Sequence, residues 1–333
     1  PWNWPVNQIG CKLAPALATG CTVVWKPSEV APFSAYLLMQ VLHDAGVPKG
    51  VVNMVNGDGP TVGSAISKHP DIQMVSFTGS TRAGIAVAQD AAPGIKRVTQ
   101  ELGGKSANII LDDLSEEAFA KAVAGGVKTL CVNSGQNCNA PSRMFVPKRR
   151  LVEAEQIVIK TMEKITVGAP EDDNTFAGPV VSKLQWDRIQ TLMQQGIEEG
   201  AQVLTGGLGK PEGLDVGYYV KPTAFTAVNN DMNIARNEIF GPVLCLIAYD
   251  LDEDAIQLAN DNDYGLSGYV SGADQDRVNN VAGQLRAGMI HLNGAQMDRT
   301  APFGGYKHSG NGRERGPQGF EEFLETKALL GTG

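Results

Sequence analysis

The sequence has 333 residues, of which 42% are hydrophobic and 19% charged, and its formal net charge is −8. A single hydrophobic core stops growing at about 250–300 residues, so we expect two lobes. The negative charge argues against a nucleic-acid-binding surface, which needs a basic stripe. There is no uncharged apolar run of about 18 residues or more, so we expect no membrane-spanning segment.

The first third of the sequence alternates between strand and helix patterns. Runs rich in β-branched residues predict strands within 21–29, 50–57, 74–80 and 97–104. Proline and glycine signals at the ends of apolar segments predict helices within 31–48, 61–70 and 81–91. This alternation is typical of a parallel, doubly wound α/β sheet.

From about Ser106 the alternation starts again. The segment ANIIL predicts a strand, and the pattern over 115–131 predicts a helix. We therefore expect a second α/β lobe that continues to about residue 302.

Loops that contain glycine follow two of the predicted strands. In FTGSTRAG, Gly79 follows a strand and Gly84 lies inside the next helix, whose free N–H groups would suit a pyrophosphate. The spacing differs from G-x-G-x-x-G, so a tight strand-to-helix turn explains the glycines equally well. Glu29, in KPSE, could accept a hydrogen bond from a ribose 2′-OH, or could simply favour the start of a helix.

The cysteines are Cys11, Cys21, Cys131, Cys138 and Cys245. They form no CxxC pair and their number is odd, which argues against a disulfide framework or a zinc site and favours a reducing cytosol. Most buried thiols act as small hydrophobic residues, so we expect Cys11, Cys21 and Cys245 to belong to the core, and Cys131 to do so too unless it is a redox neighbour of Cys138.

Cys138 stands apart because of its surroundings, NSGQNCNAPSR. Gly135 permits an unusual backbone, so the N–H groups that follow can point into a cleft. A thiolate that attacks a carbonyl carbon creates an oxyanion, and the N–H of Cys138 is a natural donor to it. The four histidines lie in no comparable pattern, so no Cys–His pair is predicted.

Glu101, in QELGGK, is the better catalytic partner. It ends an apolar strand, where burial would raise its pKa toward the range of a general base. The alternative is a carboxylate at the end of a strand that is bonded by the two glycines after it.

Seven segments occur in one order along the chain: PWNWP, KPSE, FTGSTRAG, ELGGKSA, GQNCNAPSR, EIFGPV and APFGGYKHSG. Taken together, they resemble the NAD(P)-dependent aldehyde dehydrogenase superfamily. The resemblance implies a Rossmann-like cofactor lobe and a second α/β catalytic lobe. The domains implied are 1–105 for the cofactor, 106–302 for catalysis, and 303–333 for a return to the cofactor domain with an oligomerisation strand.

The resemblance also implies roles for single residues. Cys138 would be the nucleophile, Glu101 the base that activates water, and Asn3 the amide of the oxyanion hole. Phe303 would line the substrate funnel. The implied cofactor contacts are Trp2, Lys26, Ser28, Glu29, Gly59, Gly79, Ser80, Gly84, Leu102, Gln185, Glu238 and Phe240. No metal is implied.

The reaction implied is oxidation of an aldehyde to the carboxylic acid through a thiohemiacetal and a thioester on Cys138. Glu29 favours NAD, because a 2′-phosphate would face a carboxylate, although NADP remains possible. A relative that transfers the acyl group to coenzyme A, and a non-catalytic protein of the same fold, remain alternatives. Glu101 argues against the first, and the set of Asn3, Glu101 and Cys138 argues against the second.

Members of this family carry well over a hundred residues before PWNWP, so we expect the sequence to be part of a longer chain. Its segment FEEFLETKALLG, 320–331, resembles the helix and strand that add to a partner's sheet in this family. The resemblance therefore implies a homodimer or homotetramer, a cytoplasmic location, and an aldehyde whose structure the sequence does not specify.

Overall fold

The computed structural model describes residues 1–331, which divide into two compact units. Unit 1 contains Pro1–Leu102, Asp298–Gly304 and the residues from Gly310 onward. Unit 2 contains Gly103–Met297 and Gly305–Ser309. Each unit is therefore assembled from segments that are distant in the sequence.

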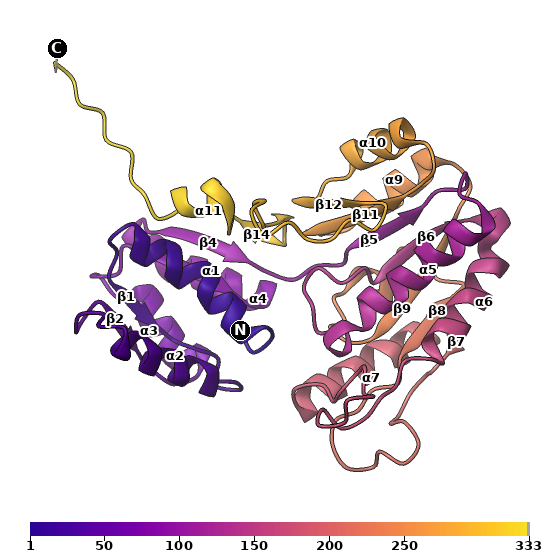
Figure 1. The fold of residues 1–333 in the computed structure, drawn as a ribbon, viewed down its shortest axis with the longest axis horizontal. Coiled ribbons are helices and arrows are strands. Elements are labelled where there is room, and N and C mark those ends of the chain that lie inside the picture. The colour runs from indigo at the N-terminus through magenta and orange to yellow at the C-terminus, as the bar shows by residue number, and fades with distance from the viewer. Residues whose placement is uncertain (332–333) are drawn as a thin grey trace. The chain divides into compact units, whose positions relative to one another are not determined.

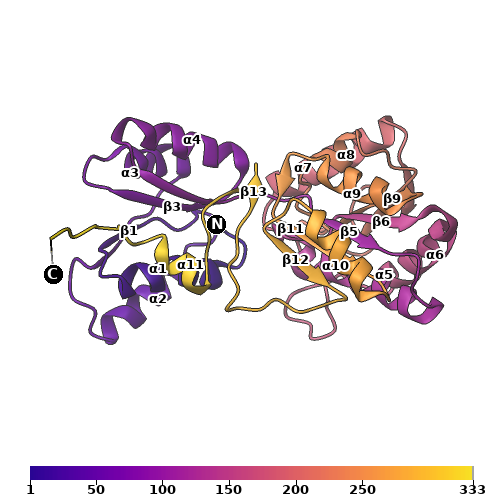
Figure 2. The ribbon, with the colours of Figure 1, turned by 90° about the horizontal axis from the view of Figure 1, so that it is seen from above.

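Unit 1 contains short strands with helices on both sides. The strands are β1 (Val23–Trp25), β2 (Val52–Met54), β3 (Met74–Thr78), β4 (Arg97–Glu101) and β14 (Gly310–Asn311). The helices are α1 (Pro5–Ala18), α2 (Phe33–Asp44), α3 (Ser64–Lys68), α4 (Thr81–Ala91) and α11 (Gly316–Glu321). In Figure 2, α3 and α4 lie on one side of β1 and β3, and α1 and α2 lie on the other. This is the doubly wound arrangement expected from the sequence.

The strands of unit 1 form two small sheets. Strands β1 and β2 pair in parallel, and so do β3 and β4, as the alternation predicts. The two pairs nevertheless belong to separate sheets, and β14 adds to β4 antiparallel. The sequence did not predict this division, because apolar runs indicate strands but not which strands are neighbours.

Unit 2 is built on a seven-stranded sheet with the order β12-β11-β5-β6-β9-β8-β7. Its strands are β5 (Ala107–Ile110), β6 (Arg143–Pro147), β7 (Gln202–Thr205), β8 (Thr223–Thr226), β9 (Val243–Tyr249), β11 (Ser267–Ser271) and β12 (Met289–Leu292). All neighbours pair in parallel except β7 and β8. A separate antiparallel pair joins β10 (Tyr264–Gly265) to β13 (Tyr306–Lys307).

Helices cover both faces of this sheet (Figure 1). On one face, α5 (Glu116–Cys131) and α6 (Leu151–Met162) bury a cluster that includes Phe119, Met144 and Leu246. On the other, residues of α7 (Lys183–Glu198), α8 (Asn233–Arg236), α9 (Asp252–Asn260) and α10 (Gln275–Gln284) pack in a second cluster. A parallel sheet covered on both faces explains why its strands are near-continuous apolar runs.

Two of the expected core cysteines are less buried than predicted. Cys131 and Cys245 are buried, whereas Cys11 and Cys21 are half-buried. Burial raises the pKa of the Cys131 thiol to about 12, so it stays protonated at neutral pH. Cys11 lies on α1, whose apolar stripe is narrow, and Cys21 precedes β1, a short strand with intermediate burial.

The predicted helix and strand near the C-terminus are only partly present. Helix α11 ends at Glu321, and residues 322–331 form no strand. A strand needs a neighbouring strand to pair with, and residues 322–331 pair with none among residues 1–331. Within residues 1–331, no helix has the length and apolar character needed to cross a membrane.

Candidate active site

The Cys138 loop, residues 132–140, begins with a left-handed turn. Asn133 (φ 52°), Ser134 (φ 55°) and Gly135 (φ 75°) follow one another in this conformation directly after α5. Non-glycine residues rarely adopt positive φ, and such outliers cluster at functional sites. The turn reverses the chain so that Cys138, which is half-buried, lies between α5 and β6.

Side chains of the loop and the neighbouring backbone hold this turn together. The Ser134 hydroxyl donates to the Gly178 carbonyl over 2.7 Å, and the Asn137 amide donates to the Val132 carbonyl over 2.6 Å. The Gln136 side chain accepts from the Val181 N–H over 2.8 Å. These bonds offset the cost of the left-handed backbone and give the loop one shape.

The two glycines of ELGGK fit against this loop. A Cβ on Gly104 would lie 2.2 Å from the carbonyl oxygen of Cys138, so only glycine allows this approach. A Cβ on Gly103 would lie 2.4 Å from a carboxylate oxygen of Glu238. The Gly104 N–H donates to the Glu238 carboxylate over 2.9 Å. Cys138, Glu238 and the ELGGK glycines therefore meet in unit 2.

Glu238 and Phe240 lie in a turn held by α7. The Gln185 amide donates to the carbonyls of Ile239 and Phe240, over 3.2 and 2.9 Å, and Phe240 has a positive φ of 58°. Burial raises the pKa of the Glu238 carboxyl to about 7, although the Gly104 N–H and nearby positive charges oppose the rise. The structure thus brings Gln185, Glu238 and Phe240 together.

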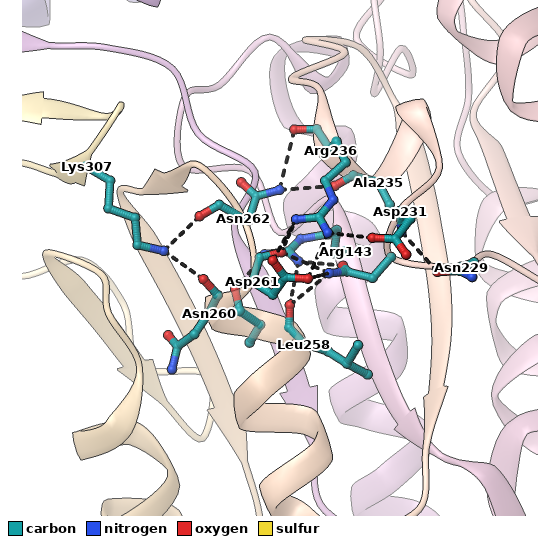
Figure 3. Close-up of polar contacts among 12 residues, drawn as sticks. Arg143, Asn229, Asp231, Ala235, Arg236, Leu258, Asn260, Asp261, Asn262 and Lys307 are labelled. Carbon is teal, nitrogen blue, oxygen red and sulfur yellow. Dashed lines mark hydrogen bonds and ion pairs between the residues drawn. The ribbon is translucent and has the colours of Figure 1, made fainter.

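A buried arginine anchors the strand that follows the Cys138 loop. Arg143, the first residue of β6, donates to the carbonyls of Lys105, Leu258 and Ala259 and to the Asn230 side chain. Figure 3 shows its guanidinium beside Leu258 and Asp261. A guanidinium can be buried when each of its nitrogens donates a hydrogen bond, as here, and these bonds fix the end of the loop relative to β5 and α9.

Glu101 ends β4 in unit 1 and is 5% exposed. Neither carboxylate oxygen has a hydrogen-bond partner among residues 1–331, so the alternative in which glycine N–H groups bond the carboxylate does not hold there. A Cβ on Gly304 would lie 2.8 Å from one of these oxygens. Burial, with a smaller effect of the Glu314 charge, raises the pKa of Glu101 to about 9.

An ion pair between Lys12 and Glu314 lies near Glu101 in unit 1. The side chains are 21% and 9% exposed, so the pair is partly desolvated. Lys12 lowers the pKa of Glu101, as do Arg313 and Arg315, while Glu314 raises it. Sequence reasoning missed this pair because its members are 302 residues apart.

Asn3 and Phe303 are both buried in unit 1. Asn3 is 7% exposed and precedes Trp4, whose left-handed backbone (φ 49°) starts α1. Phe303 exchanges two backbone hydrogen bonds of 2.7 Å with Glu314 and packs under the Arg315 guanidinium. Trp2 is half-buried beside Asn3 in the sequence.

The residues expected to contact adenosine lie where β1 and β2 end. Lys26 donates to the carbonyls of Pro27 and Gly57 and forms a 3.3 Å ion pair with Glu29, which is exposed. Gly59 starts the turn that Asp58 caps, and Ser28 is half-buried between Lys26 and Glu29. In parallel sheets, ligands bind beyond the carboxyl ends of strands, so Lys26, Glu29 and Gly59 fit a nucleotide.

The expected diphosphate turn joins β3 to α4. Ser80 caps the helix by accepting from the Ala83 N–H. A Cβ on Gly84 would lie 2.6 Å from the Leu102 side chain, so the glycine lets α4 pack close to the end of β4. The first N–H groups of α4 and its dipole fit an anion at this turn.

Comparison with known proteins agrees with this geometry. The model of the aldehyde dehydrogenase family matches residues 1–329. A 3-succinoylsemialdehyde-pyridine dehydrogenase from a Pseudomonas species is 58% identical over 331 residues, which are 99% of this chain and 69% of the relative. A putative aldehyde dehydrogenase from Staphylococcus haemolyticus is 47% identical over the same share of each chain.

Two solved structures are similar throughout the chain. A mutant of aldehyde dehydrogenase C from Pseudomonas syringae, complexed with NAD+ and octanal, has a TM-score of 0.98 at 53% identity; the match covers 100% of this chain and 68% of that one. A point mutant of betaine aldehyde dehydrogenase from Staphylococcus aureus, in complex with NAD+, has a TM-score of 0.94 at 38% identity, with 98% of this chain and 66% of that one covered. The chain therefore belongs to the aldehyde dehydrogenase family, whose members oxidise aldehydes with a nicotinamide cofactor.

Proposed function

We propose that the chain oxidises its aldehyde to a carboxylic acid by hydrolysis of a thioester on Cys138. The observation that carries this proposal is the Cys138 loop, in which a left-handed turn and the close approach of Gly104 fix the backbone around a half-buried thiol. Ordinary core cysteines such as Cys131 have no comparable setting. Glu101, a buried carboxyl without a hydrogen-bond partner in residues 1–331, supports the hydrolytic step.

In this mechanism the Cys138 thiolate adds to the aldehyde carbon and forms a thiohemiacetal. The backbone N–H of Cys138 and the Asn3 amide stabilise the oxyanion, and loss of one such donor typically costs about 10²–10³ in rate. Bound NAD would accept a hydride from the same carbon. Glu101, in its carboxylate form, then takes a proton from the water that attacks the thioester, and the carboxylic acid leaves as the Cys138 thiolate is restored.

We assign the cofactor contacts by the same reasoning. Unit 1 would bind the adenosine through Lys26, Ser28, Glu29 and Gly59, and the diphosphate through the turn at Gly79, Ser80 and Gly84. Trp2 and Leu102 would line the site, and Gln185 would support Glu238 and Phe240 at the nicotinamide ribose. The proposed domains are those expected from the sequence, 1–105, 106–302 and 303–333. The exposed Glu29 carboxylate favours NAD over NADP.

The test measures NADH formation and acid release with a panel of aldehydes. The panel includes octanal and a pyridine-bearing aldehyde, because one similar protein is complexed with octanal and another is named for a pyridine-bearing semialdehyde. Cys138→Ser abolishes turnover, whereas Cys11→Ser, which alters another half-buried thiol, leaves it within about twofold. Glu101→Gln leaves a burst of NADH but stalls acid release.

Two results would contradict the proposal. Turnover in the Cys138→Ser variant would remove the nucleophile from the mechanism. Formation of acyl-CoA in place of free acid, when coenzyme A is added, would assign the chain to the acyl-transferring branch instead.

We also propose a cytoplasmic homo-oligomer. No disulfide joins any of the five cysteines among residues 1–331, which suits a reducing compartment. Leu329 and Leu330 are 72% and 91% exposed near the C-terminal end, which suits a segment that another copy covers.

A further inference from the structure

A stacked pair of rings lies beside the Cys138 loop in unit 2. Tyr269 on β11 and His291 on β12 are cross-strand neighbours in the parallel register. Their ring centroids are 4.7 Å apart and the planes differ by 9°, so the rings stack face to face. Such stacking is worth about 0.5–1.5 kcal/mol beyond the buried area and fixes the orientation of both rings.

The phenol of Tyr269 contacts the loop itself. Its hydroxyl donates a hydrogen bond of 2.9 Å to the carbonyl of Asn139, the residue after Cys138. The Cys138 charge contributes to a raised pKa of Tyr269, second to burial, which agrees with a short separation between the phenol and the thiol. The phenol is therefore neutral at physiological pH and remains a donor.

The imidazole of His291 bonds to a second loop. His291 is 8% exposed, and its Nδ1 lies 2.9 Å from the carbonyl of Ala295. A carbonyl oxygen only accepts, so Nδ1 carries the proton and the ring is held as one tautomer. Ala295 lies in the loop after β12, so the ring pair connects this loop to the loop that carries Cys138.

Tyr269 and His291 belong to neither of the two large apolar clusters of unit 2. On the neighbouring strand, Asn108 is the register partner of Tyr269, and Gly126 of α5 packs against Asn108. Since α5 ends at Cys131 and the Tyr269 hydroxyl contacts Asn139, the chain that follows α5 lies over the same face of the sheet. Tyr269 therefore supports the loop where α5 no longer covers the sheet.

We propose that Tyr269 and His291 are positioning residues for the nucleophile: the phenol holds the backbone at Asn139, and the stacked imidazole holds the phenol. This inference rests on the proposed role of Cys138 and adds two residues to it. Neither ring touches the reacting atoms in this proposal. They act by limiting the positions that the Cys138 backbone can take, and a misplacement of about 1 Å can cost about 10² in rate.

The experiment measures the pre-steady-state burst of NADH with octanal, together with the dissociation constant for NAD and the thermal midpoint. Tyr269→Phe keeps the ring and removes the bond to Asn139, so the burst rate falls about tenfold while NAD affinity stays within about twofold. Tyr249→Phe is the matched control, because its hydroxyl donates over the same 2.9 Å to a strand carbonyl, that of Ile110. This control leaves the burst rate unchanged.

A double-mutant cycle tests whether His291 acts through Tyr269. His291→Ala slows the burst about fivefold in the native background and has little further effect on top of Tyr269→Phe. His291→Phe, which keeps the stack, restores most of the rate.

The outcomes separate this inference from the proposed function. An unchanged burst in Tyr269→Phe overturns the inference, as does a slower burst accompanied by an equal loss of NAD affinity or a drop in the thermal midpoint beyond that of Tyr249→Phe. Additive effects of the two substitutions overturn the coupling. Turnover by Cys138→Ser instead overturns the proposed function itself.

Discussion

Glu101 is the residue whose burial has the clearest measurable effect. Its ordinary pKa of 4.5 is raised to about 9 in the folded chain, so the folded state holds a proton that the unfolded state releases between these values. The free energy of unfolding therefore falls as the pH rises from about 4.5 to about 9, by about 1.4 kcal/mol per pH unit for one full proton.

Glu101→Gln removes this dependence. We expect the variant to gain stability relative to the native chain as the pH rises from about 5 to about 8, because the amide needs no proton to remain buried. Denaturant titrations at several pH values measure the difference, and other titrating groups cancel in it. A difference that stays constant over this pH range would contradict the raised pKa.

Gly104 lies where the neighbouring backbone leaves no space for a side chain. A methyl group there would lie 2.2 Å from the Cys138 carbonyl oxygen, which is backbone and cannot swing aside. We expect Gly104→Ala to lower the burst rate at least about 10²-fold, since the loop must shift. Gly125→Ala is the control, because nothing lies within 4 Å of its added Cβ and alanine favours the helix; it stabilises the chain by up to about 1 kcal/mol.

At the scale of elements, β6 depends on Arg143. The guanidinium lies 2% exposed and donates to three carbonyls and one side-chain amide, so its removal leaves buried acceptors without donors. We expect Arg143→Met to lower the free energy of unfolding by about 3–5 kcal/mol.

The control for this prediction is Arg149→Met. Arg149 pairs with Asp112 at the surface, with its side chain 68% exposed, so its loss costs less than about 1 kcal/mol. Chemical denaturation of both variants measures the two losses in the free energy of unfolding. Equal losses would contradict the prediction that the buried hydrogen bonds of Arg143 stabilise the fold more than the surface ion pair of Arg149.

The sequence predicted many elements well and their assembly less well. The helix predicted over 81–91 has these bounds in α4, and the strand within 74–80 is β3. Local signals such as Ser80 and the β-branched run are sufficient for those elements. The division of unit 1 into two sheets depends on pairing between distant segments, which no local pattern records.

The candidate site shows the same limit. Cys138, Glu101 and the ELGGK glycines stand out through unusual residues in apolar surroundings, and the family resemblance adds their roles. The contacts of Lys12 with Glu314 and of Tyr269 with Asn139 join positions far apart in sequence, with ordinary residue types at each end. Only the folded chain reveals them.

At the scale of the whole molecule, the exposed leucines near the C-terminal end predict association. Leu330 is 91% exposed, and we expect Leu330→Asp to lower the molecular mass measured by light scattering to that of a smaller assembly. Val216→Asp, at a residue 89% exposed in unit 2, leaves the mass unchanged. A native chain that is monomeric at micromolar concentration would contradict the predicted oligomer.

The strand order of unit 2 determines when, during synthesis and folding, the surroundings of the Cys138 thiol form. Strand β9 pairs with β6, yet it comes much later in the chain, and Gly241 just before it meets Gly135 in the left-handed turn. During synthesis, Cys138 is therefore made long before the segment that shapes its loop. Until these distant strands pair, the loop around Cys138 lacks its folded shape, so the surroundings of this thiol form late in folding.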